Sequence, residues 1–256
     1  MVTGPGRIAS GHAAVDRYLD SSYLRVPGMS SRFSAAICMH LMRRQSEAGV
    51  RGDAVEIGAF EGRFFIAMAL ALVDDERAVG IDTFDWPDGG VQQRMLAHCS
   101  AAGLAPERFV TWKGNTATLP VDGLRSRLSV RQARFVHVDG DHTEGFLTHD
   151  LELAHHVLHP QGIVAVDDML HPSYPTLIVT VLDYLDRYPE MAVLCIVDRE
   201  DISAAAKFLL CRKSAADGYE RDLMTSFAGC HYPFAAKIRG RTTLILTPEP
   251  KLAFIG

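Results

Sequence analysis

The chain has 256 residues, of which 48% are hydrophobic and 22% charged, so it can bury a core and is too apolar for a disordered protein. Its net charge of −5, with Lys and Arg scattered along the chain, argues against a nucleic-acid-binding protein. The longest apolar stretch, 64–73, is too short to cross a membrane, and no segment has the pattern of a signal peptide. We therefore expect a cytoplasmic globular protein that binds neither membranes nor nucleic acids.

The five cysteines lie at wide spacings without a Cys-x-x-Cys pair, which argues against a structural zinc site. Two of them, Cys195 and Cys211, lie inside apolar runs. We therefore predict buried free thiols, as expected in a reducing compartment.

The predicted elements begin with residues 13–48, which have a helical pattern interrupted at Val26-Pro27-Gly28. From residue 54 onward, short runs rich in β-branched residues alternate with segments of helical periodicity. Core strands are predicted at 54–57, 78–82, 108–112, 134–139, 162–167, 192–197 and 207–211. A further helix is expected at 219–228, and one more strand at 242–246.

Most of these strands are nearly all apolar in their centres, as in 135–138 and 163–166, which is typical of parallel strands covered on both faces. Strands that alternate with helices predict βαβ units, so the fold class is α/β with a mostly parallel sheet. We divide the chain into an N-terminal helical extension (1–50), a core (51–212) and a C-terminal addition (213–256). The apolar additions at both ends favour a homodimer.

The segment 56–62, Glu-Ile-Gly-Ala-Phe-Glu-Gly, follows the first core strand and leads into a helix. Gly58 allows a sharp turn and a close approach of a ligand to the backbone, and Gly62 opens a helix whose N–H groups face that ligand. A dinucleotide fingerprint has glycine where Phe60 stands, so a nicotinamide or flavin cofactor is disfavoured. Glu56 suits a cationic ligand better than a phosphate, and S-adenosylmethionine (SAM) is such a ligand.

Asp82 ends the second core strand, 24 residues after Gly58. An acidic residue at this place can accept hydrogen bonds from both hydroxyls of a ribose. The alternative is an ordinary helix cap, but the coupling to the Glu56 turn at this spacing favours the ribose role.

These residues resemble the pattern of the class I SAM-dependent methyltransferases: segment 56–62 is similar to their first motif, and Asp82 to their second-strand acid. Gly114-Asn115-Thr116 is similar to the turn that lies near adenine in that family. The resemblance covers roughly residues 50–211 and implies a Rossmann-like, seven-stranded, mostly parallel sheet with helices on both faces. The residues that would then bind SAM are Glu56, Gly58, Ala59, Phe60, Gly62, Asp82, Thr83, Asn115, Thr116 and Asp139.

Two further strand ends carry acidic residues: Asp139 and Asp141 follow the fourth core strand, and Asp167 and Asp168 the fifth. If these strands are neighbours, as the resemblance implies, their tips lie about 5 Å apart, and unpaired carboxylates would raise one another's pKa values. A hard divalent cation resolves the repulsion, and oxygen ligands favour Mg²⁺, Mn²⁺ or Ca²⁺ over zinc. We predict a metal site, with Mg²⁺ first, at Asp139, Asp167 and Asp168; the alternatives are helix caps or turns, and Asp141 in place of Asp139.

The string 139–145, Asp-Gly-Asp-His-Thr-Glu-Gly, together with segments 160–162 and 167–168, resembles a metal-dependent O-methyltransferase branch that acts on sugars and other natural-product hydroxyls. The caffeoyl-CoA and catechol O-methyltransferases use related aspartates. In the macrolide-sugar members, the histidine that matches His142 is the general base, and this implies the same role here, with Asp139 as the alternative base. Glu144 stands where the branch usually has an aromatic residue, so the substrate stays open.

The sequence therefore predicts a SAM-dependent, Mg²⁺-dependent O-methyltransferase in which the metal lowers the pKa of a small-molecule hydroxyl. The alternatives are a metal-independent methyltransferase, a metal-dependent hydroxylase-like protein and a non-catalytic SAM-binding protein on the same fold. Two further expectations concern the acceptor: His171 lines its pocket or lies in an ordinary loop, and an N-terminal stretch closes over it as a lid or packs as simple helices. The lid residues are Tyr23, Val26, Pro27, Met29 and Arg32.

Overall fold

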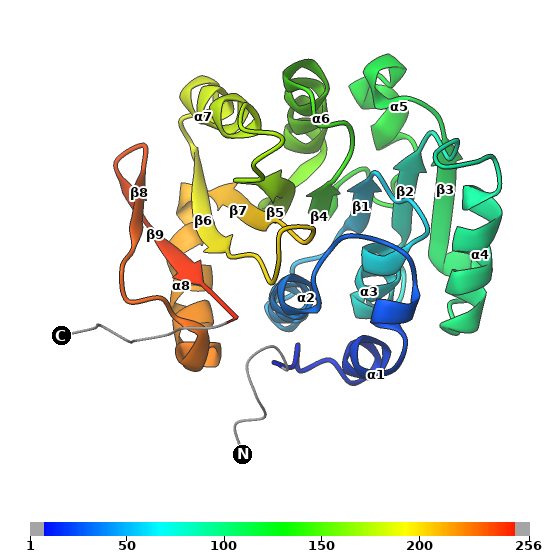
Figure 1. Cartoon of the computed structure of the whole chain (residues 1–256), viewed down its shortest axis with the longest axis horizontal. Coiled ribbons are helices and arrows are strands. Elements are labelled where there is room, and N and C mark those ends of the chain that lie inside the picture. Colours follow the sequence, from blue (N-terminus) through cyan, green and yellow to red (C-terminus); the bar gives the residue numbers. More distant parts are fainter. Residues whose placement is uncertain (1–7, 249–256) are drawn as a thin grey trace.

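The structure is a computed structural model that describes residues 8–248, and its centre is one twisted sheet between two layers of helices (Figure 1). Within the described residues the sheet has nine strands in the order β3-β2-β1-β4-β5-β7-β6-β9-β8. In that order they are β3 (Phe109–Lys113), β2 (Ala78–Asp82), β1 (Asp53–Ile57), β4 (Ala133–Val138), β5 (Leu158–Met169), β7 (Ala206–Arg212), β6 (Met191–Val197), β9 (Arg241–Leu246) and β8 (Ala236–Ile238).

The first five strands of this order are parallel, and β7 runs antiparallel to both of its neighbours, β5 and β6. The seven predicted core strands therefore form the expected α/β, mostly parallel sheet. The count of seven was too low, because β9 joins β6 in parallel and β8 joins β9 in a hairpin. The prediction had the strand at 242–246 but left it outside the sheet, and the three-residue β8 is too short for a periodic signal.

The helices lie on both faces of the sheet, as predicted (Figure 1). Side chains of α1 (Ala13–Ser21), α2 (Arg32–Glu47), α3 (Arg63–Ala71), α4 (Val91–Ala101) and α8 (Lys213–Ser226) belong to one core cluster. Those of α5 (Val121–Arg125), α6 (Glu144–Val157) and α7 (Leu177–Arg187) belong to the other. Four 3₁₀ turns complete the described elements: η1 (Tyr23–Arg25), η2 (Pro106–Arg108), η3 (Thr116–Thr118) and η4 (Ala228–Cys230).

The chain breaks between η1 and α2, as Pro27 and Gly28 predict. The helix α2 begins after Ser31, whose hydroxyl accepts a hydrogen bond from the N–H of Ser34 at 2.9 Å. This cap leaves segment 26–30 extended between the two helices, and that segment lies beside the cavity described below.

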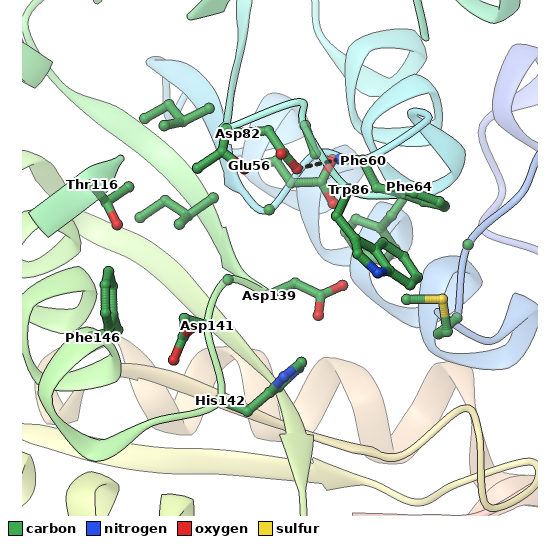
Figure 2. Close-up of a pocket in the computed structure, with 18 of the residues that line it drawn as sticks. Glu56, Phe60, Phe64, Asp82, Trp86, Thr116, Asp139, Asp141, His142 and Phe146 are labelled. Atoms are coloured by element: carbon green, nitrogen blue, oxygen red, sulfur yellow. Dashed lines mark hydrogen bonds between the residues drawn. The ribbon is translucent and has the colours of Figure 1, made fainter. Parts of the chain in front are cut away.

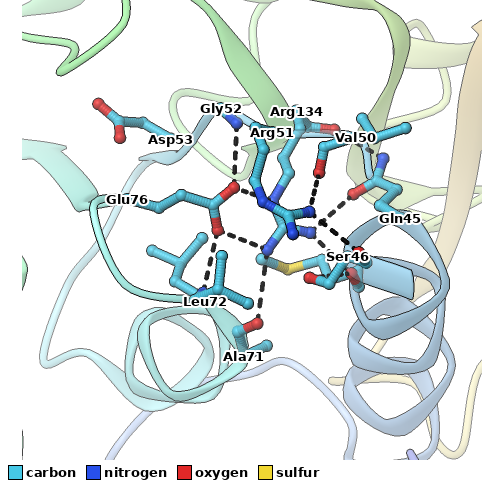
Figure 3. Close-up of polar contacts among 12 residues, drawn as sticks. Gln45, Ser46, Val50, Arg51, Gly52, Asp53, Ala71, Leu72, Glu76 and Arg134 are labelled. Atoms are coloured by element: carbon cyan, nitrogen blue, oxygen red, sulfur yellow. Dashed lines mark hydrogen bonds and ion pairs between the residues drawn. The ribbon is translucent and has the colours of Figure 1, made fainter. Parts of the chain in front are cut away.

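At the edge of the sheet where the parallel strands begin, a buried ion pair joins β4 to the loop before β2 (Figure 3). The guanidinium of Arg134 donates to both carboxylate oxygens of Glu76, at 2.9 and 2.8 Å, and to the carbonyl of Met42 in α2. Glu76 also accepts from the N–H of Gly52, just before β1. Because Arg134 and Glu76 are almost fully buried, this network fixes the edge opposite the cavity.

No helix within residues 8–248 is long and apolar enough to cross a membrane.

The five cysteines are free thiols, and four of them are buried, as predicted from the apolar runs. Burial raises the pKa of Cys195 and Cys211, so these thiols are packing groups and not nucleophiles.

Candidate active site

A cavity of about 630 Å³ opens where β1, β2, β3 and β4 end, within the range of roughly 300–1,000 Å³ found for small-molecule sites. This is the edge at which ligands bind in open α/β sheets. Its lining comes from segments 27–30, 56–60, 63–64, 81–83, 114–116 and 139–142, together with Trp86, Phe146 and Tyr174.

Most of the predicted site residues line this one cavity. Every residue of the predicted SAM-binding set does so except Gly62, which has a φ of 90° and is the residue before α3. The predicted base His142 and its alternative Asp139 also line it. The predicted metal ligands Asp167 and Asp168 do not line the cavity and lie behind its wall. His171, expected in the acceptor pocket, does not line it either, whereas the nearby Tyr174 does.

The turn after β1 depends on glycine at position 58. Gly58 has a φ of 85°, and a Cβ there would lie 1.8 Å from the carbonyl oxygen of Asp139. The N–H groups of Gly58 and Ala59 donate to the carbonyl of Ile81, and that of Gly62 donates to Ala59. Because the turn consumes these N–H groups internally, it is not a cradle for a phosphate.

Asp82 closes this turn from β2. Its Oδ2 accepts the N–H of Phe60 at 2.8 Å and its Oδ1 accepts the N–H of Phe84 at 2.7 Å, and Figure 2 shows the first of these bonds. Each carboxylate oxygen keeps a second lone pair, and Asp82 lines the cavity. The carboxylate is thus held rigidly while it can still accept two hydrogen bonds from a ligand.

Glu56 is a buried carboxylate with one oxygen unsatisfied. Its Oε1 lies 2.7 Å from Nδ1 of His137, whereas Oε2 has no hydrogen-bond partner in the part of the chain that the structure describes. Burial raises the pKa of Glu56, because the charged form is cut off from water. A cationic donor in the cavity would satisfy this oxygen and stabilise its charge.

The described lining carries four carboxylates, those of Glu56, Asp82, Asp139 and Asp141, against one guanidinium, that of Arg63. This balance favours a ligand with net positive charge. Arg63 was not singled out from the sequence, although it directly follows Gly62 at the start of α3. Its Nε donates to the carbonyl of Val26 at 2.7 Å, which holds it beside the extended N-terminal segment.

His142 and Asp168 form a hydrogen-bonded pair, with Nε2 and Oδ2 2.7 Å apart. The hydrogen bond with Asp168 raises the pKa of His142 above its ordinary value. The imidazole also stacks on Tyr174, with ring centroids 4.1 Å apart and planes at 7°. Both contacts fix the orientation of the ring at the wall of the cavity, as an oriented base requires.

Asp139 follows β4 and lies between the turn after β1 and His142 (Figure 2). Its backbone N–H donates to the carbonyl of Ile57, which fixes the position of the residue. Burial raises its pKa well above the ordinary value, and the negative charge of Asp167 adds to the effect.

Behind this wall, Asp167 forms a buried ion pair with Lys207, the second residue of β7. The ammonium also donates to Oγ of Ser30 at 2.9 Å and lies 3.0 Å from Nε2 of His137. Burial opposes ionisation of Asp167, but the charge of Lys207 holds its pKa well below the usual range. Lys207 was not singled out from the sequence, although a lone lysine in an otherwise apolar strand is a signal for a buried charge.

The predicted metal ligands are not brought together as one set. Asp139, His142 and Asp168 have donor atoms within 4.8 Å of one another, but His142 and Asp168 are bonded to each other, and Asp167 is paired with Lys207. A second group, Glu56, His137 and Asp139, has the same difficulty, because the two nitrogens of His137 face Glu56 and Lys207. Since most of these donors are committed to protein partners, the arrangement does not fit a divalent cation.

One family model and many solved structures are similar to this chain. Residues 55–169 match a family model described as a methyltransferase domain. CalS11, a TDP-rhamnose 3′-O-methyltransferase of calicheamicin biosynthesis, is 18% identical with a TM-score of 0.55, over 77% of this chain and 86% of that one. TomG from Streptomyces achromogenes, an O-methyltransferase solved with SAM, is 19% identical with a TM-score of 0.55, over 79% and 88%.

An O-methyltransferase from Bacillus cereus, solved with S-adenosylhomocysteine (SAH), is 14% identical with a TM-score of 0.55, over 78% of this chain and 91% of that one. No curated protein matches the chain. At these identities the solved structures establish the fold, which is the predicted Rossmann-like one. With the family match, they confirm the resemblance that segment 56–62 and Asp82 carry.

Proposed function

We propose that the chain transfers the methyl group of SAM to a hydroxyl oxygen of a small molecule, and the match of residues 55–169 to the model of a methyltransferase domain supports this. The observation that carries the proposal is the turn after β1, which uses its N–H groups internally beside the buried, unsatisfied oxygen of Glu56. Such a site favours a cationic ligand without phosphate, and SAM carries an ammonium and a sulfonium group. The structural neighbours solved with SAM and SAH support this choice.

Each part of SAM has a suitable group in the cavity. Asp82 would accept both ribose hydroxyls, and Asn115 and Thr116, after β3, would lie beside the adenine. Glu56 would bind the ammonium. We add Arg63 to the predicted set, because its guanidinium is the group in the lining that can pair with the SAM carboxylate. The remaining predicted residues, Gly58, Ala59, Phe60, Gly62 and Thr83, shape the turns around the ligand.

The acceptor would enter over the wall formed by Met29, Trp86, Tyr174 and His142. Met29 and Trp86 are exposed apolar side chains at this cavity, so they suit the hydrophobic part of a small molecule. Pro27 and Met29, from the proposed lid, do line the cavity, whereas Tyr23 and Val26 are buried in the core. The lid role is therefore proposed for segment 27–30 alone.

When bound, SAM supplies an electrophilic methyl group on its sulfonium. The chain's own contribution is to hold the acceptor oxygen in line with that group and to take its proton. Asp168 would keep the proton on Nε2 of His142, which leaves Nδ1 as the basic nitrogen. As the acceptor oxygen bonds to the methyl carbon, the carbon–sulfur bond of SAM breaks to give SAH, and the hydroxyl proton passes to Nδ1. Asp139 is the second candidate for the proton acceptor.

We propose no role for Mg²⁺ in this reaction, because His142, Asp167 and Asp168 are bonded to other groups of the chain. The hydroxylase-like and non-catalytic alternatives lack an observation that favours them, whereas the contact of His142 with Asp168 supports its proposed role as a base.

The first experiment is calorimetric titration of the purified chain with SAM, SAH and, as a control dinucleotide, NAD⁺. We expect stoichiometric binding of SAM and SAH and no binding of NAD⁺. Binding of NAD⁺ in preference to SAM by folded protein would remove the proposal. A panel of small-molecule alcohols, sugars and phenols, with SAH formation as the readout, then identifies the acceptor class.

A further inference from the structure

We propose that Lys207 is a built-in cation at the acidic edge of the sheet, and that its ammonium takes the place of a divalent metal among these carboxylates. The inference rests on the proposed function, because it states how that same site balances its charge. It makes Lys207 a positioning residue, which holds the carboxylate of Asp167 behind the cavity wall.

The topology of the sheet brings Lys207 to this edge. The strand β7 runs antiparallel to β5, so the beginning of β7 meets the end of β5. Val166 pairs with Phe208 and Met169 with Ala206, and this register places Lys207 opposite Asp167. Asp167, at the end of the parallel strand β5, thus meets Lys207 at the start of the antiparallel strand β7, 40 residues later in the chain.

The surroundings of the ammonium are those of a bound cation. Its Nζ has three polar neighbours, the carboxylate of Asp167, Oγ of Ser30 and Nε2 of His137. The ring of Phe64 lies 5.1 Å from Nζ, at a distance that favours a cation–π contact. Lys207 is 0% exposed, so its charge is balanced by these neighbours and not by solvent.

The charge that Lys207 brings is matched to the nearby acids. Burial disfavours a charged lysine, yet Asp167 and Asp139 raise the pKa of Lys207. The ion pair neutralises Asp167, and the remaining predicted metal ligands are Asp139 and Asp168. Asp168 is bonded to His142, so Asp139 alone keeps its carboxylate for a ligand in the cavity. The lysine therefore removes Asp167 from the predicted set of three carboxylate ligands.

The test is a titration of the chelator-treated full chain with Mn²⁺, followed by calorimetry and by the electron paramagnetic resonance signal of free Mn²⁺. We expect wild type to show no stoichiometric Mn²⁺ site and to bind SAM equally with and without EDTA. In Lys207→Met, which keeps the length of the side chain and loses the charge, we expect a new site with at least about tenfold tighter Mn²⁺ binding. The new site should raise the thermal unfolding temperature when Mn²⁺ is present.

Two further variants define the origin of that site. Lys207→Met combined with Asp167→Asn removes both charges and should bind no Mn²⁺. Lys213→Met, at an exposed lysine of α8, is the matched control and should behave as wild type. If Lys207→Met does not fold, with or without Mn²⁺, Lys207→Gln replaces it in the same Mn²⁺ titration, with the same expected result. Glutamine loses the positive charge but keeps a hydrogen-bond donor to Asp167.

A stoichiometric Mn²⁺ site in wild type that is lost in Asp167→Asn overturns the inference, as does a folded Lys207→Met variant that gains no Mn²⁺ binding. Failure of the proposed function would instead be seen as a wild-type protein that does not bind SAM, whatever the outcome with Mn²⁺. SAM binding therefore tests the proposed function, and Mn²⁺ binding tests the role of Lys207.

Discussion

Nε2 of His142, in the loop after β4, lies 2.7 Å from Oδ2 of Asp168 at the end of β5, across 26 residues of sequence. Asp168 has a φ of 56°, in the left-handed region that is unfavourable for most residues. The strain falls on the residue that orients the proposed base, as is common at functional sites.

The first prediction concerns the base itself. His142→Gln should lower kcat by about 10²- to 10⁴-fold and leave the Kd for SAM within about twofold, because the proposed role of the imidazole is to take the acceptor proton. The measurement is steady-state SAH formation together with SAM calorimetry. His171→Gln, which removes a neighbouring imidazole outside the cavity lining, is the control and should keep nearly full activity. An unchanged kcat in His142→Gln would move the role to Asp139.

The second prediction is the pH dependence of kcat. The hydrogen bond with Asp168 raises the pKa of His142, and the base works in its neutral form. Activity should therefore fall as pH decreases through a pKa above about 6.5. In Asp168→Asn the carboxylate charge is lost, so the acid limb of the profile should move to lower pH while kcat also decreases. A limb that stays in place would show that His142 is not the titrating group.

The third prediction concerns the ribose site. Asp82→Asn should weaken SAM binding by roughly 10- to 100-fold, as expected for the loss of about 1.5–3 kcal/mol from hydrogen bonds to a charged group. The amide oxygen can still accept one backbone N–H of the turn, so thermal unfolding should change little. Asp85→Asn is the control, because that exposed carboxylate bonds only the Thr83 hydroxyl in the described contacts. Equal SAM affinities for both variants would contradict the assignment.

The fourth prediction concerns the turn after β1. Gly58→Ala should destabilise the fold by more than about 3 kcal/mol, because the added Cβ meets the carbonyl of Asp139 at a positive φ. Chemical denaturation measures the free energy of unfolding. Gly145→Ala is the matched control, since nothing lies within 4 Å of its Cβ on α6, and it should change stability by less than about 1 kcal/mol.

The fifth prediction separates stability from function. Arg134→Met should cost about 3–5 kcal/mol, because it leaves Glu76 buried without its partner, and Arg134→Met with Glu76→Gln should recover part of that loss. Arg125→Met, which removes a surface pair with Asp122, should cost less than about 1 kcal/mol. The folded fraction of Arg134→Met should keep its SAM affinity, because the network lies at the edge opposite the cavity.

Much of the fold could be predicted because its signals are local. The apolar centres of β1, β4 and β5 show that both faces of the sheet are covered, and the break at Pro27 and Gly28 separates α1 and η1 from α2. The glycine at position 58 is a local signal too, since the turn permits no Cβ there. The predicted SAM-binding residues follow strand ends, and parallel strands bring their ends to one edge.

What the sequence by itself determined was therefore the alternation of strands and helices, the turn after β1 and the presence of acids at four strand ends. Only the tertiary structure decided how those acids are partnered. The antiparallel register of β7 places Lys207 against Asp167, and the positive φ of Asp168 turns its carboxylate to His142. Such pairings depend on sheet order and side-chain direction across tens of residues, which one-dimensional periodicity does not encode.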